Sequence, residues 1–273
     1  GSSECPTFNN NVLYVNANNT STYQDGSSWA YAFSSLQNAL DMYNSNCGAT
    51  AQEVWVAQGI YYPDDGNNQI AGNRDESFHL PEDIIILGGF SGTETNSNQR
   101  DWENNITVLS GDINTPNQIN DNSYNIIKTT NVGNNMLLDG FTIEKGNAVK
   151  ISTYGQRGGA WLNRTTSGSD TSTPTVKNCI FKNNQSLTSA GALFLDGVTG
   201  STVGINLEYC TFKDNSSTGG SSGNGGNGGA ITIETFSGEV TLNVNIENCI
   251  FNDNSANQNG GAIWSRQNTN DDG

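Results

Sequence analysis

The sequence predicts an all-β protein that folds as a right-handed parallel β-helix, with one amphipathic helix capping its N-terminal end. Two short motifs recur in a fixed order through the second half of the chain, as expected for stacked rungs. The first half contains short β-branched runs bounded by turn residues. Composition agrees: of 273 residues 32 are Gly and 14% are charged, while 5 Trp, 9 Tyr and 10 Phe can fill a narrow core.

Residues 1–52 are expected to form an N-terminal cap that is continuous with the rungs. Val12–Val15 has the length and composition of a first strand. Helical spacing of apolar residues then predicts a helix over Ser34–Asn46, with Ser34 as its N-cap and an apolar face made of Phe33, Leu36, Leu40 and Tyr43. The open end of a solenoid exposes its core and unpaired backbone, so this helix is expected to cover that end.

Residues 53–273 are expected to form the rungs of one continuous β-helix. In the first half of this region the runs are irregular, and long polar loops take the place of crossover helices. The strand-length apolar runs are Val54–Val56, Ile84–Leu87, Ile106–Leu109, Ile126–Ile127 and Met136–Leu138.

The second half repeats two motifs. The first is a Cys-x-Phe strand followed by Asn, and the second is a Gly/Ala-rich turn leading into an apolar strand. The Cys-x-Phe copies begin at Cys179, Cys210 and Cys249, and the second motif occurs at Gly158–Trp161, Ala190–Leu193, Gly228–Ile231 and Gly260–Ile263. The asparagines after the first strand are expected to form a ladder of side-chain hydrogen bonds; they are Asn184, Asn215 and Asn254.

Strand alternation decides which side chains of the second motif face the core. If the residues at Trp161, Leu193, Ile231 and Ile263 point inward, one outer column consists of charged residues, namely Arg164, Asp196, Glu234 and Arg266. The opposite register would bury these charges at a cost of several kcal/mol per ion, so the first register is predicted.

The five cysteines fall into two groups. Cys5 and Cys47 flank the N-terminal segment and are expected to form a disulfide. The three cysteines of the repeat are odd in number and point toward the core, which favours buried, reduced thiols.

The repeats resemble those of the chlamydial polymorphic outer-membrane proteins, a family of autotransported adhesins. Phe181–Asn184, Phe212–Asn215 and Phe251–Asn254 carry this resemblance, together with the Gly-Gly-Ala sites. The N-terminal segments Leu13–Ala17, Asp25–Trp29 and Gly88–Glu94 are similar to the start of exported β-helix proteins of Bacteroidetes-type bacteria. The resemblance implies a pectate-lyase-like solenoid, export to the cell surface or medium, and an adhesive role.

Net charge excludes several partners. With a formal charge of -16 and only 11 Lys and Arg, the chain lacks the cations that nucleic acid binding requires. The same charge disfavours polyanionic sugars unless cations bridge the repulsion. No run reaches the ~18–20 apolar residues of a membrane span, so no membrane insertion is expected. The polar C-terminal run predicts that further C-terminal domains follow.

The charged column allows two interpretations. Asp196 and Glu234, flanked by Arg164 and Arg266, could act as the paired carboxylates of a sugar-cleaving or Ca²⁺-assisted lyase site. Alternatively, Arg164 pairs with Asp196 and Glu234 with Arg266 across neighbouring strands, which would be structural.

Two further sites are candidates for ligand binding. Phe194 and Trp264 are expected to point outward two rungs apart, where they could stack on sugars, unless a loop such as Ser216–Gly228 covers them. Asp64 and Asp65 offer hard oxygen ligands for Ca²⁺, although the same residues suit an ordinary turn.

The sequence therefore favours a secreted or cell-surface module that binds a glycan or a cell-surface protein without catalysis. A polysaccharide lyase or glycoside hydrolase acting on an outer face is the main alternative, and a structural spacer is the second.

Overall fold

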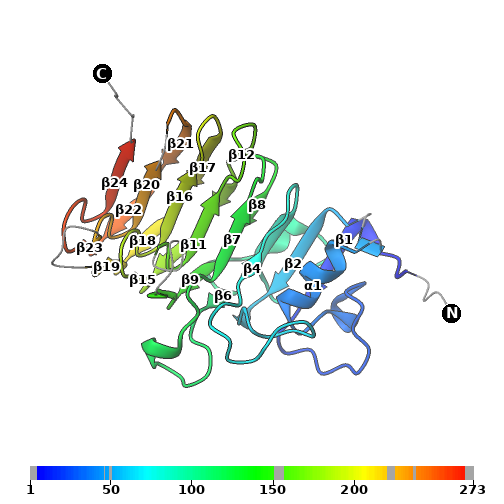
Figure 1. Ribbon diagram of the computed structural model, residues 1–273. Helices are drawn as coiled ribbons and strands as arrows, with labels where there is room; N and C mark the ends of the chain where they lie inside the picture. The colour runs from blue at the N-terminus through cyan, green and yellow to red at the C-terminus, as the bar shows by residue number, and fades with distance from the viewer. Residues whose placement is uncertain are drawn as a thin grey trace.

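The computed structural model describes residues 5–45, 47–48, 51–150, 157–219, 225–235 and 238–267. In this part of the chain nearly all regular structure is β, and the strands pair in parallel into four sheets (Figure 1). The chain visits the sheets in a repeating order, and from β13 onward each complete circuit adds one strand to each sheet. This is the architecture of a parallel β-solenoid, as the sequence predicted.

Sheet 1 has the most strands. Its strands are β1 (Val12–Val15), β2 (Glu53–Ala57), β5 (Ile85–Phe90), β8 (Leu137–Asp139), β12 (Thr171–Ser172), β13 (Thr175–Lys177), β17 (Thr202–Glu208) and β21 (Thr241–Glu247). Sheet 2 follows it along the chain and contains β3 (Gly59–Tyr61), β6 (Thr107–Ser110), β9 (Thr142–Glu144), β14 (Ile180–Lys182), β18 (Thr211–Lys213) and β22 (Ile250–Asn252).

Two further sheets complete each circuit. Sheet 3 contains β4 (Phe78–His79), β7 (Ile127–Thr130), β11 (Trp161–Arg164), β16 (Leu193–Gly197), β20 (Ile231–Thr235) and β24 (Ile263–Gln267). Sheet 4 is a narrow corner made of β10 (Asn147–Ala148), β15 (Gln185–Ser186), β19 (Ser216–Ser217) and β23 (Ser255–Ala256). Short 3₁₀ turns occur at Asn9–Asn11, Trp29–Tyr31, Ser97–Gln99 and Ile119–Asp121.

Sheet 1 supplies strands that the repeat motifs did not reveal. β17 and β21 run in register over seven residues, from Thr202 opposite Thr241 to Glu208 opposite Glu247. Their alternating sequences, Val-Gly-Ile-Asn-Leu-Glu and Leu-Asn-Val-Asn-Ile-Glu, are a period-2 pattern that could have identified them. Each repeat therefore has two more strands than its two motifs suggest, one in sheet 1 and a short one in sheet 4.

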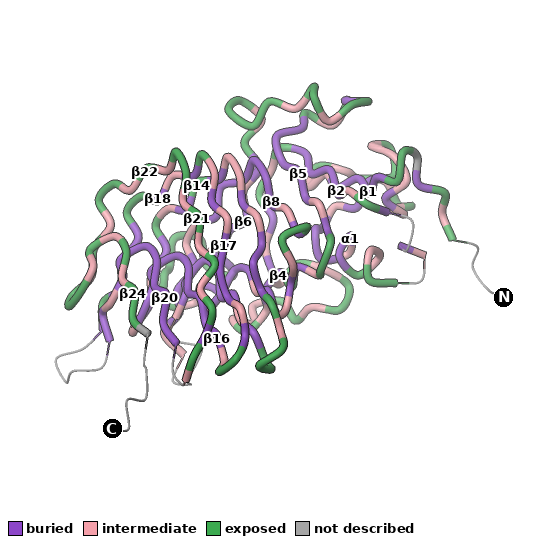
Figure 2. Tube along the Cα trace, turned by 90° about the horizontal axis from the view of Figure 1, so that it is seen from above, coloured by how far each residue is buried: buried purple, intermediate pink, exposed green. Residues whose placement is uncertain are grey.

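The core is a stack of like side chains. Phe181, Phe212 and Phe251 lie one above another, with ring centroids 4.6 and 5.0 Å apart and nearly parallel planes. Cys179 and Cys210 are free and buried, and Cys249 is free and half-buried in the last rung. Figure 2 shows the interior strands buried, whereas β22 and β24 at the end of the described rungs are largely exposed or intermediate.

The predicted asparagine ladder is present. Asn184 Nδ2 donates to Asn215 Oδ1 at 3.0 Å, and Asn215 Nδ2 donates to Asn254 Oδ1 at 2.9 Å. The same amide groups also bond backbone atoms of adjacent rungs, such as the Phe181 carbonyl. Asn184 and Asn215 are fully buried, so their side-chain amide groups form hydrogen bonds to protein atoms where exposed amides would bond water.

One short helix, α1 (Leu36–Tyr43), packs against β1 and β4 at the N-terminal end (Figure 1). Its buried face includes Leu36, Ala39 and Leu40. The predicted N-cap was wrong by one residue: Ser35 Oγ accepts the Gln37 N–H at 3.1 Å, whereas Ser34 bonds the side chain of Gln24. β1 pairs directly with β2, so the cap continues the first sheet of the solenoid.

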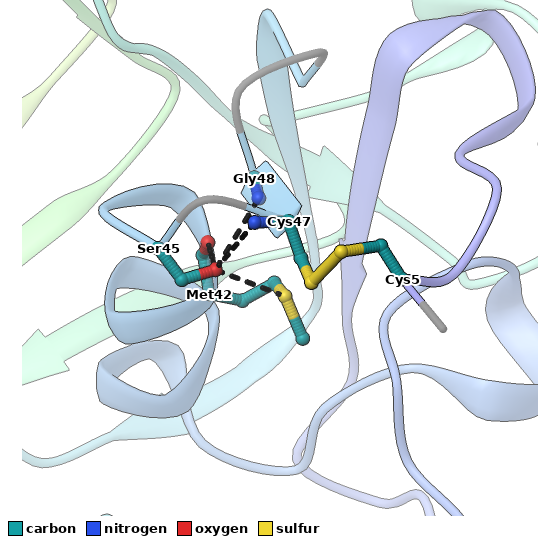
Figure 3. The surroundings of a disulfide bond; sticks show 5 residues. All are labelled: Cys5, Met42, Ser45, Cys47 and Gly48. Atoms are coloured by element: carbon teal, nitrogen blue, oxygen red, sulfur yellow. Dashed lines mark hydrogen bonds between the residues drawn. A yellow bond between two sulfur atoms is a disulfide. The ribbon is translucent and has the colours of Figure 1, made fainter. Parts of the chain in front are cut away.

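The predicted disulfide joins Cys5 to Cys47 just after α1. Figure 3 shows Ser45 beside it, where the serine Oγ accepts the backbone N–H groups of Cys47 and Gly48. The bond closes a segment of 42 residues and so restricts the unfolded chain around the cap. Among the described helices, none has the length and apolar character to cross a membrane.

Candidate ligand-binding face on sheet 3

The outer face of sheet 3 carries two parallel columns of side chains. The pairing of adjacent strands confirms the predicted register and places Arg164, Asp196, Glu234 and Arg266 in one column. The neighbouring column runs through His79, Lys128, Leu162, Phe194, Thr232 and Trp264. The first strands, β4 and β7, extend this face beyond the repeat motifs.

Of the two possibilities left open for Phe194, exposure or coverage, the structure shows coverage. Its side chain points away from the core, yet it is completely buried in a small cluster with Leu162 and Ala190. The Arg157 guanidinium lies 5.2 Å from the centre of the Phe194 ring and helps to cover it. Trp264 is half-buried on the last described strand of the sheet. The two aromatics therefore do not form the exposed pair that the sequence suggested.

The two carboxylates of the charged column are also largely covered. Asp196 and Glu234 are 3% and 8% exposed. Burial raises the pKa of both carboxyl groups, and nearby guanidinium groups oppose this shift: Arg164 and Arg157 act on Asp196, and Arg157 and Arg266 act on Glu234. Arg164 therefore acts electrostatically on Asp196, and Arg266 on Glu234, as in the two predicted pairings.

Arg157 was missed in the sequence. It lies in β-bridge register with Ser189, and the same column continues through Asn227 and Asn259. Small polar residues fill this position in the other rungs, so aligning the residue before each Gly/Ala-rich turn would have identified an exceptional arginine. Its guanidinium stabilises two buried carboxylates and shields an aromatic ring, which is a structural role.

The accessible part of this face is a pocket of about 300 Å³ over β4, β7 and β11. Cationic and aromatic side chains converge on it from strands and loops. Its lining includes His79, Tyr124, Lys128, Lys150, Leu162 and Arg164.

Lys128 is the central cation of the pocket. It is half-buried beside His79 and takes part in no ion pair within the described residues. Desolvation lowers its pKa, and Lys150 lowers it further, while Asp75 and Glu76 oppose the shift. His79 is exposed on β4; desolvation at the pocket and the positive charge of Lys128 lower the pKa of its imidazole, while Glu76 opposes the shift.

The Tyr124 ring is the aromatic surface of the pocket. The Arg74 guanidinium lies 4.1 Å from the ring centre, and Lys150 Nζ lies 5.6 Å from it. Arg74 is fixed by a 2.6 Å hydrogen bond to the Asn122 carbonyl, and Lys150 forms an ion pair with Asp75. Both cations thus lie over the Tyr124 ring and are held there by these contacts.

Positive side chains gather on this side of an acidic protein, together with the carboxyl groups of Asp75, Glu76, Asp196 and Glu234. Six of the 11 Lys and Arg residues lie on or beside the outer face of sheet 3, namely Arg74, Lys128, Lys150, Arg157, Arg164 and Arg266. The net charge of -16 therefore does not describe the local field at the pocket.

The Asp64–Asp65 loop is organised by its own hydrogen bonds. Asp64 Oδ2 accepts the Gly72 N–H at 2.8 Å, and the Asp65 carbonyl accepts the hydroxyl of Ser35. Burial and the neighbouring Asp64 raise the pKa of Asp65. In the described part of the chain no group of three or more His, Cys, Asp or Glu is arranged to hold a metal, so the Ca²⁺ site stays a prediction.

The pocket residues escaped the sequence reasoning because they lie outside the repeats. The strand residues among them could have been found by alignment with β11. Phe78–His79 and Ile127–Lys128 have an inward residue followed by an outward one, as Trp161–Leu162 does. Tyr124 and Lys150 lie on loops, whose positions no periodicity predicts.

Comparison of the chain with protein families, curated proteins and solved structures gave no match. The resemblances to exported bacterial β-helix proteins consequently remain predictions, and the case for function depends on the geometry of the site.

Proposed function

We propose that this protein is an exported, non-catalytic module that binds an acidic glycan through the pocket on sheet 3. The solenoid, which we take to be right-handed as almost all parallel crossovers are, displays the pocket on a rigid sheet. The disulfide between Cys5 and Cys47 supports an oxidising, extracellular location, either secreted or at a cell surface.

The observation that carries this proposal is Lys128, a half-buried cation that faces the pocket without an ion-pair partner among the described residues. A partly desolvated ammonium gains more from a carboxylate or sulfate than a hydrated surface lysine does. Arg164 and Lys150 border the same space and add to its positive charge. The Tyr124 ring lines the same space.

Burial of the charged column argues against the enzyme alternative. A glycoside hydrolase needs two accessible carboxyl groups on either side of the scissile bond. Asp196 and Glu234 are each less than a tenth exposed and lie close to Arg157. A pure spacer, the third alternative, would have no need for a partly buried lysine at the bottom of a pocket.

Replacing Lys128 by Met should weaken binding of an acidic oligosaccharide by about ten- to a hundredfold, because a charge-assisted hydrogen bond contributes ~1.5–3 kcal/mol. Met preserves the length and apolar stem of the side chain. Calorimetric titration with a panel of uronic acid and sulfated oligosaccharides, beside the methyl-esterified forms of the uronates, would measure the effect.

Lys182→Met is the matched control. Lys182 is also a strand lysine, but it lies on sheet 2 and pairs with Glu144 at 3.0 Å. It should leave the affinity unchanged. Failure to bind any acidic oligosaccharide, or equal affinity for the free and esterified forms, would contradict the proposal.

A further inference from the structure

A second groove lies on the outer face of sheet 2, away from the residues that line the cationic pocket. It has a volume of about 450 Å³ and crosses the strands β6, β9, β14 and β18. Its lining includes Trp102, Ile106, Thr142, Asn178, Ile180 and Tyr209. Glu103 is the one charged side chain among the residues described as lining it.

Tyr209 occupies a position where local folding does not favour tyrosine. It lies at the corner that precedes each strand of sheet 2, where the equivalent residues are Gly140, Asn178 and Asn248. All four have positive φ, between 50° and 84°. Gly and Asn tolerate this left-handed conformation, whereas a bulky side chain is strained there.

Burial does not compensate for this strain, because Tyr209 is 61% exposed. Residues held in unfavourable backbone conformations concentrate at functional sites. An exposed tyrosine in place of the preferred asparagine therefore points to contact between its ring and a ligand.

Trp102 provides a second ring at the same corner. Trp102 packs against Gly140, the corner residue before β9. The Trp102 Cβ is 3.0 Å from the position that a Cβ on Gly140 would take. The Arg100 guanidinium lies 4.7 Å from the Trp102 ring centre and is itself anchored to Asp139 at 2.5 Å. The Trp102 indole is thus held by Arg100, while 36% of the residue stays exposed.

Two rungs separate the corners of Trp102 and Tyr209, which corresponds to about 9–10 Å and roughly the length of a disaccharide. Asn178 occupies the corner between them, and its Nδ2 donates to Asp139 Oδ1 at 2.8 Å. That bond fixes the amide and leaves its carbonyl oxygen as an acceptor for a hydroxyl group. Thr142 and Thr211 add hydroxyl groups to the same floor.

We propose that this groove binds a neutral oligosaccharide, with sugar rings stacked on Trp102 and Tyr209 and hydroxyl groups bonded to Asn178. Aromatic faces bind the C–H faces of sugars, and the absence of Lys and Arg from the described lining gives acidic sugars no counter-charge. The site is separate from the cationic pocket and does not depend on the function proposed for it.

Tyr209→Asn tests this site without endangering the fold, because it installs the residue that the neighbouring rungs use. It should keep or raise the melting temperature while weakening binding of a neutral oligosaccharide by about three- to tenfold. The probes are glucan, xylan and mannan oligosaccharides, titrated by calorimetry or followed by saturation-transfer NMR.

Tyr23→Ala is the matched control, since Tyr23 is equally exposed at 61% and is not among the residues that line the groove. It should leave neutral-sugar binding unchanged, as should Lys128→Met. No binding of any neutral oligosaccharide, or equal losses in Tyr209→Asn and Tyr23→Ala, would overturn the proposal. Loss of neutral-sugar binding in Lys128→Met would also overturn it, by placing these sugars in the other pocket.

Discussion

Replacing Phe212 with alanine is expected to lower the free energy of unfolding by about 3–5 kcal/mol. The ring is completely buried and stacks between Phe181 and Phe251, at 4.6 and 5.0 Å. Its loss would remove contacts on both sides and leave a cavity that rigid neighbouring rungs cannot fill. Equilibrium denaturation in guanidinium chloride would measure the change.

Thr211→Ala is the control for this variant. Thr211 precedes Phe212 on β18 and points to the opposite face of the sheet, where it is half-buried. Its replacement should cost less than about 1 kcal/mol. Equal destabilisation by the two variants would mean that the strand faces the other way.

Asn215→Ala should destabilise the protein by about 2–4 kcal/mol, although it removes only a small side chain. Asn215 Oδ1 accepts both the backbone N–H and the Nδ2 of Asn184, at 3.1 and 3.0 Å. Its Nδ2 donates to the Phe181 carbonyl and to Asn254. Alanine would leave several of these groups buried without partners, each at a cost of ~1–3 kcal/mol.

Asn245→Ala is a suitable comparison for the ladder. Asn245 also bonds an asparagine one rung away, since its Nδ2 donates to Asn206 Oδ1 at 2.7 Å, but it is exposed. Water can replace the lost bond, so the change should lie within about 0.5 kcal/mol. If thermal or chemical denaturation gave similar losses at both positions, burial would not be the source of the ladder's stability.

The sequence predicted the repeated rungs well because the core constrains them directly. Stacked strands place each inward residue on its counterpart in the next rung, so Phe181, Phe212 and Phe251 had to be similar in shape. The asparagine ladder followed for the same reason. Strands of sheet 1 lacked a distinctive motif, and only their alternation of apolar and polar residues marked them.

The outer face was predicted less well because exposure depends on what covers a side chain. Strand alternation correctly placed Phe194 outside the core, but it gave no information about Arg157, which lies over the ring. The pocket on sheet 3 combines strand residues with Tyr124 and Lys150 from loops. Neither the repeat pattern nor the net charge indicates that these residues lie together in space.

His79 offers a direct measurement of ligand binding at sheet 3, because it is the single histidine of the chain and lines the pocket. Although His79 is exposed, desolvation at the pocket and Lys128 lower its pKa from the usual 6.5, while Glu76 opposes the shift. A bound carboxylate or sulfate would stabilise the imidazolium ion and raise this pKa. By linkage, an acidic oligosaccharide should bind more tightly as the pH falls through the pKa of His79.

An NMR titration of the His79 imidazole against pH, with and without a saturating acidic oligosaccharide, therefore tests the central claim. We expect a low pKa in the free protein and a higher one in the complex, with no change when the methyl-esterified oligosaccharide is added. An acidic oligosaccharide that binds while the His79 resonance and pKa stay unchanged would place the site elsewhere and contradict the assignment of this pocket.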